Sequence, residues 1–335
     1  TTSKIVSLDR GPHYVYSLSA KNIKSLYIDK SGIYWVGTVK GGINKFDKNL
    51  TLFETIDSER FEDNRHNSPI ITAFAEDKAG RIFFSTNGGG LFGFDINSQA
   101  LQRYPLSYPN TQPAVLPPIL TLCAPSKKEL LIGTYGEGLL IFNRQTNKYR
   151  QFRLEEKGFS AGSNSIYCIM EDRKGNIWLG TNGGGVFILN RSMEVTRNIC
   201  SGPTNTSGTK YSINSFIRAL AEDRDGNIWI GTHGGGISVY RPDIDSLQTY
   251  YASDTGLSDN KISPLAEDVF GNIWIGTFCR GLCVLDRKKN SFITYGEKEG
   301  LQNTSIYSIL PDSSDMLWLT TNTGISTINV STRVI

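Results

Sequence analysis

A short strand motif that ends in Gly-Thr recurs along this chain at a nearly constant spacing. Five full copies, with sequences from YWVGT to IWIGT, end at Thr38, Thr134, Thr181, Thr232 and Thr277. Two degenerate copies, FFST and LWLTT, end at Thr86 and Thr321. Neighbouring copies stand 44 to 51 residues apart, and a period of about 40 to 50 residues is typical of the four-stranded blades of a β-propeller.

The residues around each motif predict the strands of one blade. In the fourth copy, apolar runs predict strands at 166–171, 177–181 and 186–190, followed by a weaker outer strand. The sequence DRKGN before the second strand predicts an Asx-type turn, because Asp caps the turn and Gly takes the left-handed position. The glycines after Thr181 allow a tight reversal into the third strand.

Aromatic residues share one position of the repeat, in the second predicted strand. The tryptophans at this position are Trp35, Trp178, Trp229, Trp274 and Trp318, and Phe83 and Leu131 replace them in the other two copies. Equivalent positions in a ring do not all face one ligand. We therefore expect these side chains to pack between neighbouring blades.

These observations predict an all-β fold, a seven-bladed β-propeller of four-stranded antiparallel blades with no helix between the strands. The whole chain, 1–335, forms this single domain. Its blades are expected at about 22–58, 67–104, 116–152, 164–199, 214–250, 260–295 and 303–330. The last blade lacks chain for a fourth strand, so the N-terminal segment 4–8 is expected to complete it and close the ring, which removes exposed strand edges.

Composition excludes several classes of protein. The net charge is only +3 and no run of Lys and Arg exceeds three residues, so nucleic-acid binding is not indicated. The five cysteines lack metal-ligand spacing, although Cys279 and Cys283 straddle a predicted turn and their pairing is left open. No apolar run reaches the roughly 18 residues of a membrane span. Since the chain does not begin with Met, it is interpreted as an excised soluble domain.

The pattern E-D-x-x-G-N-I-W-I-G-T, followed by x-G-G-G, resembles the two-component regulator propeller repeat. Three copies match it almost letter for letter, and 17–38 is similar to a blade opening of that family. The resemblance implies a periplasmic, ligand-sensing region of a hybrid two-component histidine kinase of the Bacteroides type. An oligosaccharide or other small molecule, neighbouring domains of the same sensor and a possible second copy are the partners it implies. The kinase itself is not recognisable in this chain.

Strand order places the turn after each Gly-Thr on the same side as the long links between blades, and binding residues concentrate on such loops. The residues of these turns differ between copies, whereas the strand motifs are nearly the same in each copy. The turn residues include planar amides, a carboxylate and aromatic rings, which suit a hydroxyl-rich ligand. The candidate ligand-binding residues are Lys40, Asn87, Tyr135, Glu137, Asn182, His233, Phe278, Arg280 and Asn322.

Other interpretations stay open at this point. The asparagines could serve only a left-handed backbone beside glycine. Further candidates in the links are Arg60, Arg65, His66, Tyr108 and Tyr211. The domain could be a dimerisation scaffold without a ligand, or a secreted propeller lyase or glycosidase. Glycoside hydrolysis usually needs two carboxyl groups, and the ring of turns offers Glu137 alone. No catalytic residue, metal or cofactor is therefore expected.

Overall fold

A computed structural model describes most of the chain. The described residues are 70–77, 80–86, 90–106, 117–126, 128–200, 213–312 and 315–333, with the backbone of three strands between 23 and 46. The chain divides into two compact units, Thr1–Arg60 and Phe61–Ile335. Each unit is considered by itself.

The unit Thr1–Arg60 contains one described sheet. Its strands are β1 (Ile23–Ile28), β2 (Tyr34–Thr38) and β3 (Gly42–Phe46). They pair antiparallel in the order β1-β2-β3. The first copy of the Gly-Thr motif therefore forms the middle strand of a three-stranded sheet.

The described part of Phe61–Ile335 contains five four-stranded antiparallel sheets and one three-stranded sheet, and within each the strands pair in chain order. The first two sheets comprise β4 (Ile71–Glu76), β5 (Arg81–Thr86), β6 (Gly90–Asp95) and β7 (Ala100–Tyr104), then β8 (Ile119–Cys123), β9 (Glu129–Thr134), β10 (Leu139–Asn143) and β11 (Lys148–Phe152). The next two comprise β12 (Ile166–Glu171), β13 (Ile177–Thr181), β14 (Val186–Leu189) and β15 (Val195–Ile199), then β16 (Ile217–Glu222), β17 (Ile228–Thr232), β18 (Ile237–Arg241) and β19 (Ser246–Tyr250). The last two comprise β20 (Ile262–Glu267), β21 (Ile273–Thr277), β22 (Leu282–Asp286) and β23 (Ser291–Tyr295), then β24 (Ile306–Pro311), β25 (Met316–Thr321) and β26 (Gly324–Asn329).

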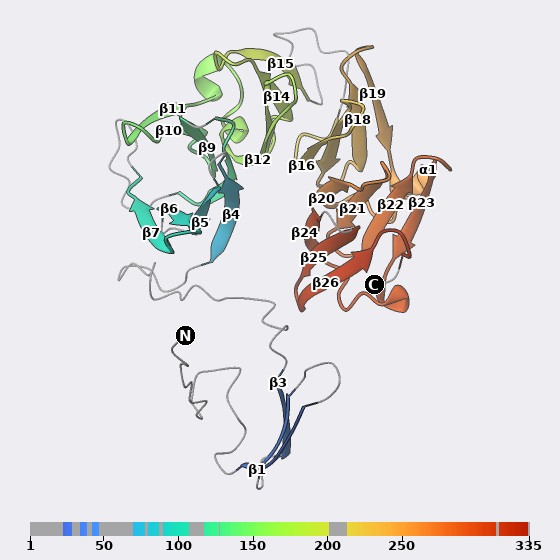
Figure 1. Cartoon of the computed structure of the whole chain (residues 1–335). Coiled ribbons are helices and arrows are strands. Elements are labelled where there is room, and N and C mark those ends of the chain that lie inside the picture. Colours follow the sequence, from blue (N-terminus) through green and yellow to red (C-terminus); the bar gives the residue numbers. More distant parts are fainter. Residues whose placement is uncertain are drawn as a thin grey trace. The chain divides into compact units, whose positions relative to one another are not determined.

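The six sheets are successive propeller blades. The first strand of each blade, its inner strand, packs against the inner strand of the next, in the series β4, β8, β12, β16, β20 and β24. Figure 1 shows these strands on the inner side of their blades, from teal to red along the chain. Each of the four middle blades is thus held by both of its sequence neighbours, and the first and last blades by one.

The expectation of seven blades is wrong, because the described part of Phe61–Ile335 forms six. The predicted first blade forms the sheet β1–β3, which belongs to the unit Thr1–Arg60. The number of motif copies predicts the number of sheets. Whether a sheet is a blade of the propeller depends on how its faces pack against neighbouring sheets, and the number of copies gives no information about that packing. The predicted closing segment 4–8 lies outside the described residues.

The links between blades contain short helical turns, contrary to the expectation that no helix would occur. They are η2 (Glu155–Lys157), η3 (Ala161–Asn164), α1 (Ala252–Thr255) and η4 (Glu297–Glu299). A Gly at left-handed φ follows three of them, at Gly158, Gly256 and Gly300. None of the described helices is long and apolar enough to cross a membrane.

The glycine of the Gly-Thr motif allows neighbouring blades to approach closely. A Cβ on Gly180 would lie 2.6 Å from the Cγ2 atom of Ile217, the first residue of the next inner strand. Gly231 and Gly276 would meet Ile262 and Ile306 in the same way, at 2.7 and 2.9 Å. Any larger residue would force the blades apart, so the motif marks a contact between blades.

The D-x-x-G-N turns fix the second-strand tryptophans. Asp223 is buried, and its carboxylate accepts hydrogen bonds from the amides of Asn227 and from Nε1 of Trp229, the last at 2.9 Å. The carboxylates of Asp172, Asp268 and Asp312 accept the same indole bond, from Trp178, Trp274 and Trp318 respectively. A polar carboxylate thereby satisfies the one donor of a buried indole.

The predicted wedge role of the tryptophans is confirmed for three of them. Trp178, Trp229 and Trp274 are buried, and each belongs to a core cluster that contains apolar residues of the next blade. Trp274, for example, packs with Ile306 and Leu319. Trp318 is half-buried, and the side chain of Trp35 lies outside the described residues. The apolar core therefore consists of layers between blades.

Cys279 and Cys283 do not form a disulfide. Cys279 lies exposed in the turn after Thr277, whereas Cys283 is fully buried within strand β22. Cys283 packs in the layer that also contains Trp229 and Leu257. Its side chain therefore points into a core layer while Cys279 faces solvent.

Replacing Asp223 by Asn should lower the free energy of unfolding by about 1–3 kcal/mol, because an amide group would replace an acceptor oxygen that faces buried donors. Burial raises the pKa of Asp223, but the hydrogen bonds from Asn227 and Trp229 and the charge of Arg287 outweigh burial and lower it below its ordinary 3.8. The stabilisation is thus present above pH 3.8 and is lost as the pH falls through the lowered value. Urea unfolding of both proteins from pH 7 downward measures the difference, which should shrink in acid.

Asp225→Asn is the matched control in the same turn. Its carboxylate is half exposed and pairs with Arg287 at the surface, so its loss should cost less than about 1 kcal/mol. Equal stability of Asp223→Asn and wild type at pH 7 would contradict the structural role of the Asp-Trp bond.

Candidate functional site

The turns after Gly-Thr and the ends of the links lie together on one side of the blade series, here called the loop face. The backbone N–H of Asn182 donates to Ser165 at the link end of its own blade, and that of Gly183 donates to Ser215 before the next blade, both at 2.9 Å. The N–H groups of His233 and Gly234 donate to Phe216 and Asn260 in the same arrangement. These bonds agree with the strand order expected from the sequence, and they hold each turn between two blades.

The last glycine of each turn completes this rigid framework. Gly185 has a φ of 76°, and a Cβ there would lie 2.2 Å from the carbonyl oxygen of Ile199. Only glycine combines this left-handed backbone with so close an approach to the outer strand. The framework is therefore fixed by backbone contacts, while the other turn side chains are free to vary.

Some candidates cannot be placed. Lys40 and Asn87 lie outside the described residues, as do the link residues Arg60, Arg65, His66, Tyr108 and Tyr211. Their assignment to a binding site stays a prediction.

Tyr135 and Glu137 share one turn, after strand β9. The Tyr135 side chain is half exposed, and its backbone N–H donates to the carbonyl of Pro118. The carboxylate of Glu137 accepts from Arg153 at 2.8 Å and from Gln151 at 3.1 Å. Tyr135 is thus available to a ligand, whereas Glu137 has partners within its own blade.

Asn182 belongs to a cluster that spans two blades. Its Oδ1 atom accepts a hydrogen bond of 3.0 Å from Nη2 of Arg218, the second residue of β16. The Arg218 Cζ atom lies 4.0 Å from the ring centroid of Tyr167, the second residue of β12. Asn182 does not have a left-handed φ, so the alternative that it serves only such a backbone is wrong. Its side chain instead orients a cation over an aromatic ring.

His233 and Phe278 form a second contact between blades. Their ring centroids lie 6.1 Å apart at an angle of 80°, an edge-to-face arrangement. Both side chains are exposed, and Phe216 beside them is also exposed. Burial, followed by the positive charges of Arg218 and Lys261, lowers the pKa of His233 below its ordinary 6.5, while Asp259 acts in the opposite direction. The ring of His233 is consequently uncharged at neutral pH.

Arg280 and Asn322 complete the placed candidates. Arg280 has an exposed side chain, and its backbone N–H donates to Oγ1 of Thr277. The Oδ1 atom of Asn322 accepts from the hydroxyl of Tyr307 at 2.8 Å. The structure does not connect Asn322 with the His233 and Phe278 pair, so the placed candidates divide into separate groups.

A β-bulge on every inner strand was not foreseen from the sequence. The register shifts at the second position of β4, β8, β12, β16 and β24, where Tyr167, Arg218 and Tyr307 stand in the last three, and over the second and third positions of β20. A bulge leaves one residue out of the ladder and redirects its side chain. The sequence does contain a signal, because this position varies while the preceding residue is always isoleucine at Ile71, Ile119, Ile166, Ile217, Ile262 and Ile306.

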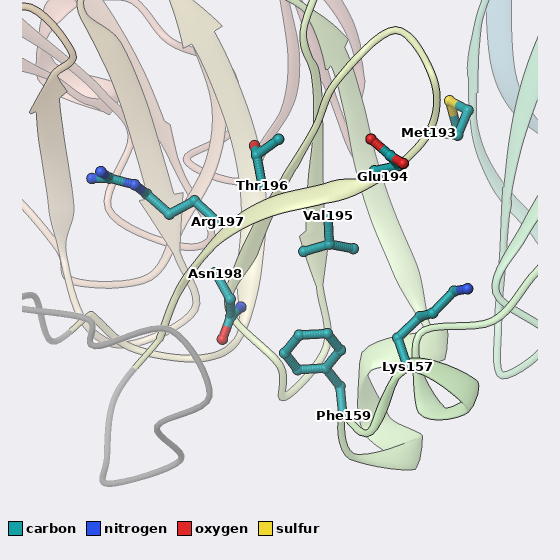
Figure 2. A pocket seen from close by; sticks show the side chains of 8 residues that line it. All are labelled: Lys157, Phe159, Met193, Glu194, Val195, Thr196, Arg197 and Asn198. Atoms are coloured by element: carbon teal, nitrogen blue, oxygen red, sulfur yellow. The ribbon is translucent and has the colours of Figure 1, made fainter.

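A pocket of about 370 Å³ lies away from these residues. Figure 2 shows its lining side chains on strand β15, the edge strand of its blade, and next to η2. Phe159, Met193 and Val195 supply apolar surface, and Lys157, Glu194 and Arg197 are the charged lining residues. Sequence reasoning did not identify this pocket, because it depends on how a link folds against an outer strand.

Comparison with known proteins agrees with the repeat. The family described as "Two component regulator propeller" matches residues 17–40, 160–183, 211–234, 256–278 and 300–323. This chain carries the two-component regulator propeller repeat. The unmatched stretch between the first two matches contains the second and third copies, FFST and LLIGT, in which Phe83 and Leu131 replace the tryptophan of the pattern.

Related proteins come from two-component systems. The chain is 25% identical over 317 residues to "Histidine kinase P4" of Formosa agariphila, covering 93% of this chain and 22% of the relative. It is 26% identical, with a TM-score of 0.69, to the extracellular domain of BT3049 from B. thetaiotaomicron, which is described as a hybrid two component system, covering 97% of this chain and 41% of that one. The chain thus spans less than half the length of either protein. Its repeat is that of the two-component regulator propeller family, and its fold is similar to that of an extracellular domain of a hybrid two component system.

A likeness of fold alone extends to an enzyme. A catalytically inactive virginiamycin B lyase from Staphylococcus aureus has a TM-score of 0.61 at 10% identity, covering 91% of this chain and 94% of the lyase. At this identity only the propeller architecture is shared.

The titration of His233 tests the electrostatics of the loop face. We expect its ring-proton resonances to titrate with a midpoint below 6.5, and Arg218→Gln should raise the midpoint because a positive charge is removed. His233→Gln assigns the signals by their loss. Lys288→Gln, in the turn after β22 at the far end of its blade, should leave the midpoint unchanged. A midpoint at or above 6.5 in the wild type would contradict the described environment.

Proposed function

We propose that this propeller senses an oligosaccharide outside the cytoplasm, in the periplasm, for a hybrid two-component histidine kinase. The observation that carries the proposal is the edge-to-face pair of His233 and Phe278 on the loop face. The backbone N–H of His233 donates to Phe216, whose side chain is also exposed. Exposed rings on a rigid turn offer stacking surface to the apolar faces of sugar rings at little entropic cost. The similarity to an extracellular domain of a hybrid two component system supports the placement outside the cytoplasm and the assignment to a two-component system.

Neighbouring polar groups suit the same ligand. The amide of Asn182, the guanidinium of Arg218 and the side chain of Arg280 lie on turns or strand ends of the loop face. Sugar hydroxyls both donate and accept, so a set of amides and guanidinium groups can match them. Recognition would then combine stacking with directed hydrogen bonds.

Signal transfer would require that the ligand binds one arrangement of the blades more tightly than another. A ligand shifts such an equilibrium only if it binds one arrangement more tightly than the other. The turns that carry His233 and Phe278 are bonded to link ends of successive blades. A ligand held there can favour one packing of those blades, and neighbouring domains of the sensor or a second copy would respond to it.

Phe278→Ala should weaken oligosaccharide binding by about tenfold or more while leaving the melting temperature nearly unchanged. Phe270→Ala is the matched control: each ring is 49% exposed, and the two residues stand at opposite ends of β21. A thermal-shift screen over oligosaccharide fragments identifies a binding sugar, and calorimetry measures the affinities. Equal losses in both variants, or none, would remove Phe278 from the site.

The double variant His233→Ala, Arg280→Ala should abolish binding of the same sugar without loss of folding. Both side chains are exposed, so their removal leaves the core intact. Retained affinity would contradict the proposed site. Release of a cleaved product by the wild type would instead favour the lyase or glycosidase alternative, and dimerisation without binding of any fragment would favour the scaffold.

A further inference from the structure

We propose that the guanidinium of Arg218 binds an anionic group of the ligand, a carboxylate or a sulfate carried by a sugar. This inference rests on the proposed function and narrows the ligand to acidic saccharides. Arg218 lies at a β-bulge of an inner strand. The binding residues predicted from the sequence lie in turns and do not include it.

The guanidinium of Arg218 is held in place before any ligand arrives. Nη2 donates to Oδ1 of Asn182 at 3.0 Å, and Nη1 donates to the carbonyl of Ile217 at 3.1 Å. The Tyr167 ring lies 4.0 Å from Cζ and covers one face of the group. Because three contacts already orient the Arg218 side chain, it loses less conformational entropy when a ligand binds.

The charge of Arg218 has no anionic partner among the residues that the structure describes. Both of its hydrogen-bond acceptors are neutral oxygens. By contrast, Arg153, Arg224 and Arg287 each form ion pairs with Glu or Asp. Arg218 is also partly buried, and burial lowers its pKa, so it has lost hydration without gaining a counter-charge. An oxyanion would supply that counter-charge.

Donors remain available on the same group. A guanidinium has five N–H donors in a planar fork, and the described contacts of Arg218 use two of its nitrogens. No nitrogen of Arg218 is buried without a hydrogen-bond partner. Nε has no partner among the described contacts and is not buried, so its N–H is accessible to solvent, where a carboxylate or sulfate oxygen can accept it.

The surroundings of Arg218 add positive charge. Lys261 lies in a β-bridge with His233, and both Arg218 and Lys261 act on that ring as cations. Asp259 is the nearby carboxylate, and it lies within 3.5 Å of the thiol of Cys279. Two cations thus lie near the uncharged imidazole of His233, which packs edge-to-face against the exposed ring of Phe278. This arrangement suits a sugar that is apolar on one face and anionic at one substituent.

Two matched pairs of saccharides separate the charge from the sugar ring. Trigalacturonate is compared with its methyl ester, and N-acetylgalactosamine 6-sulfate with N-acetylgalactosamine, by calorimetry on the whole chain. The acidic member of at least one pair should bind about tenfold or more tightly than its neutral partner. The pair that shows the difference tells a carboxylate from a sulfate.

Variants assign the difference to Arg218. Arg218→Gln should remove the preference for the acidic member, and Arg218→Lys should keep part of it because a charge without the planar fork remains. Lys288→Gln removes one charge at the far end of its blade and should change nothing. A preference that survives Arg218→Gln would overturn the inference.

A probe without any sugar makes the test independent of ligand identity. The Nε–H resonance of Arg218, assigned by its loss in Arg218→Lys, should shift saturably with sodium sulfate or sodium acetate, and not with sodium chloride at equal ionic strength. A response no larger than that to chloride would overturn the inference. If Arg218 does not respond to these anions but a neutral oligosaccharide binds at Phe278, the proposed function still stands. If Arg218 responds to the anions but no saccharide binds, the result counts against the proposed function and not against anion binding by Arg218.

Discussion

The close approach of each inner strand to the blade before it sets the geometry of the rest of the molecule. Gly180, Gly231 and Gly276 have no room for a Cβ, because the first isoleucine of the next inner strand lies within 3 Å of that position, as do Cys168 and Pro264 of the same blade at Gly180 and Gly276. This contact fixes the distance between sheets, and the tryptophans of the second strands then fill the layer between them. Dense packing leaves little freedom for one blade to move without its neighbours.

The same constraint produces the loop face. Because successive blades lie so close, the turn after Gly-Thr reaches the link end of the next blade and donates backbone hydrogen bonds to it. The side chains of that turn take no part in these bonds and are free to differ between copies. A uniform backbone with varied side chains is the arrangement in which a repeat protein evolves recognition without loss of stability.

Local patterns in the sequence were sufficient for the elements of a blade. The strands predicted in the fourth copy begin and end within one residue of β12, β13 and β14. The turn chemistry of Asp and Gly and the wedge role of Trp178 were likewise readable, because each depends on neighbours close in the chain. The turn positions of Asn182, His233 and Phe278 followed from strand order alone.

Features that depend on contacts between different strands, blades or links were not predicted from the sequence. The number of blades is one such property: the sheet that contains the first Gly-Thr motif lies in another unit than the remaining six. The bulges that carry Tyr167 and Arg218 are another, since a shift of register is defined only once two strands are paired. The pocket at β15 also required the folded link next to it.

Recognition and transmission meet at the junction of two blades. Asn182 and Tyr167 belong to the blade that contains β12, whereas Arg218 belongs to the blade that contains β16, and the three are joined by one hydrogen bond and one cation–π contact. His233 and Phe278 stand in the same relation across the following junction. A ligand that contacts either cluster contacts two blades at once. Under the proposed function, a ligand that binds one relative position of these two blades more tightly than another would thereby couple its binding to the arrangement of the propeller.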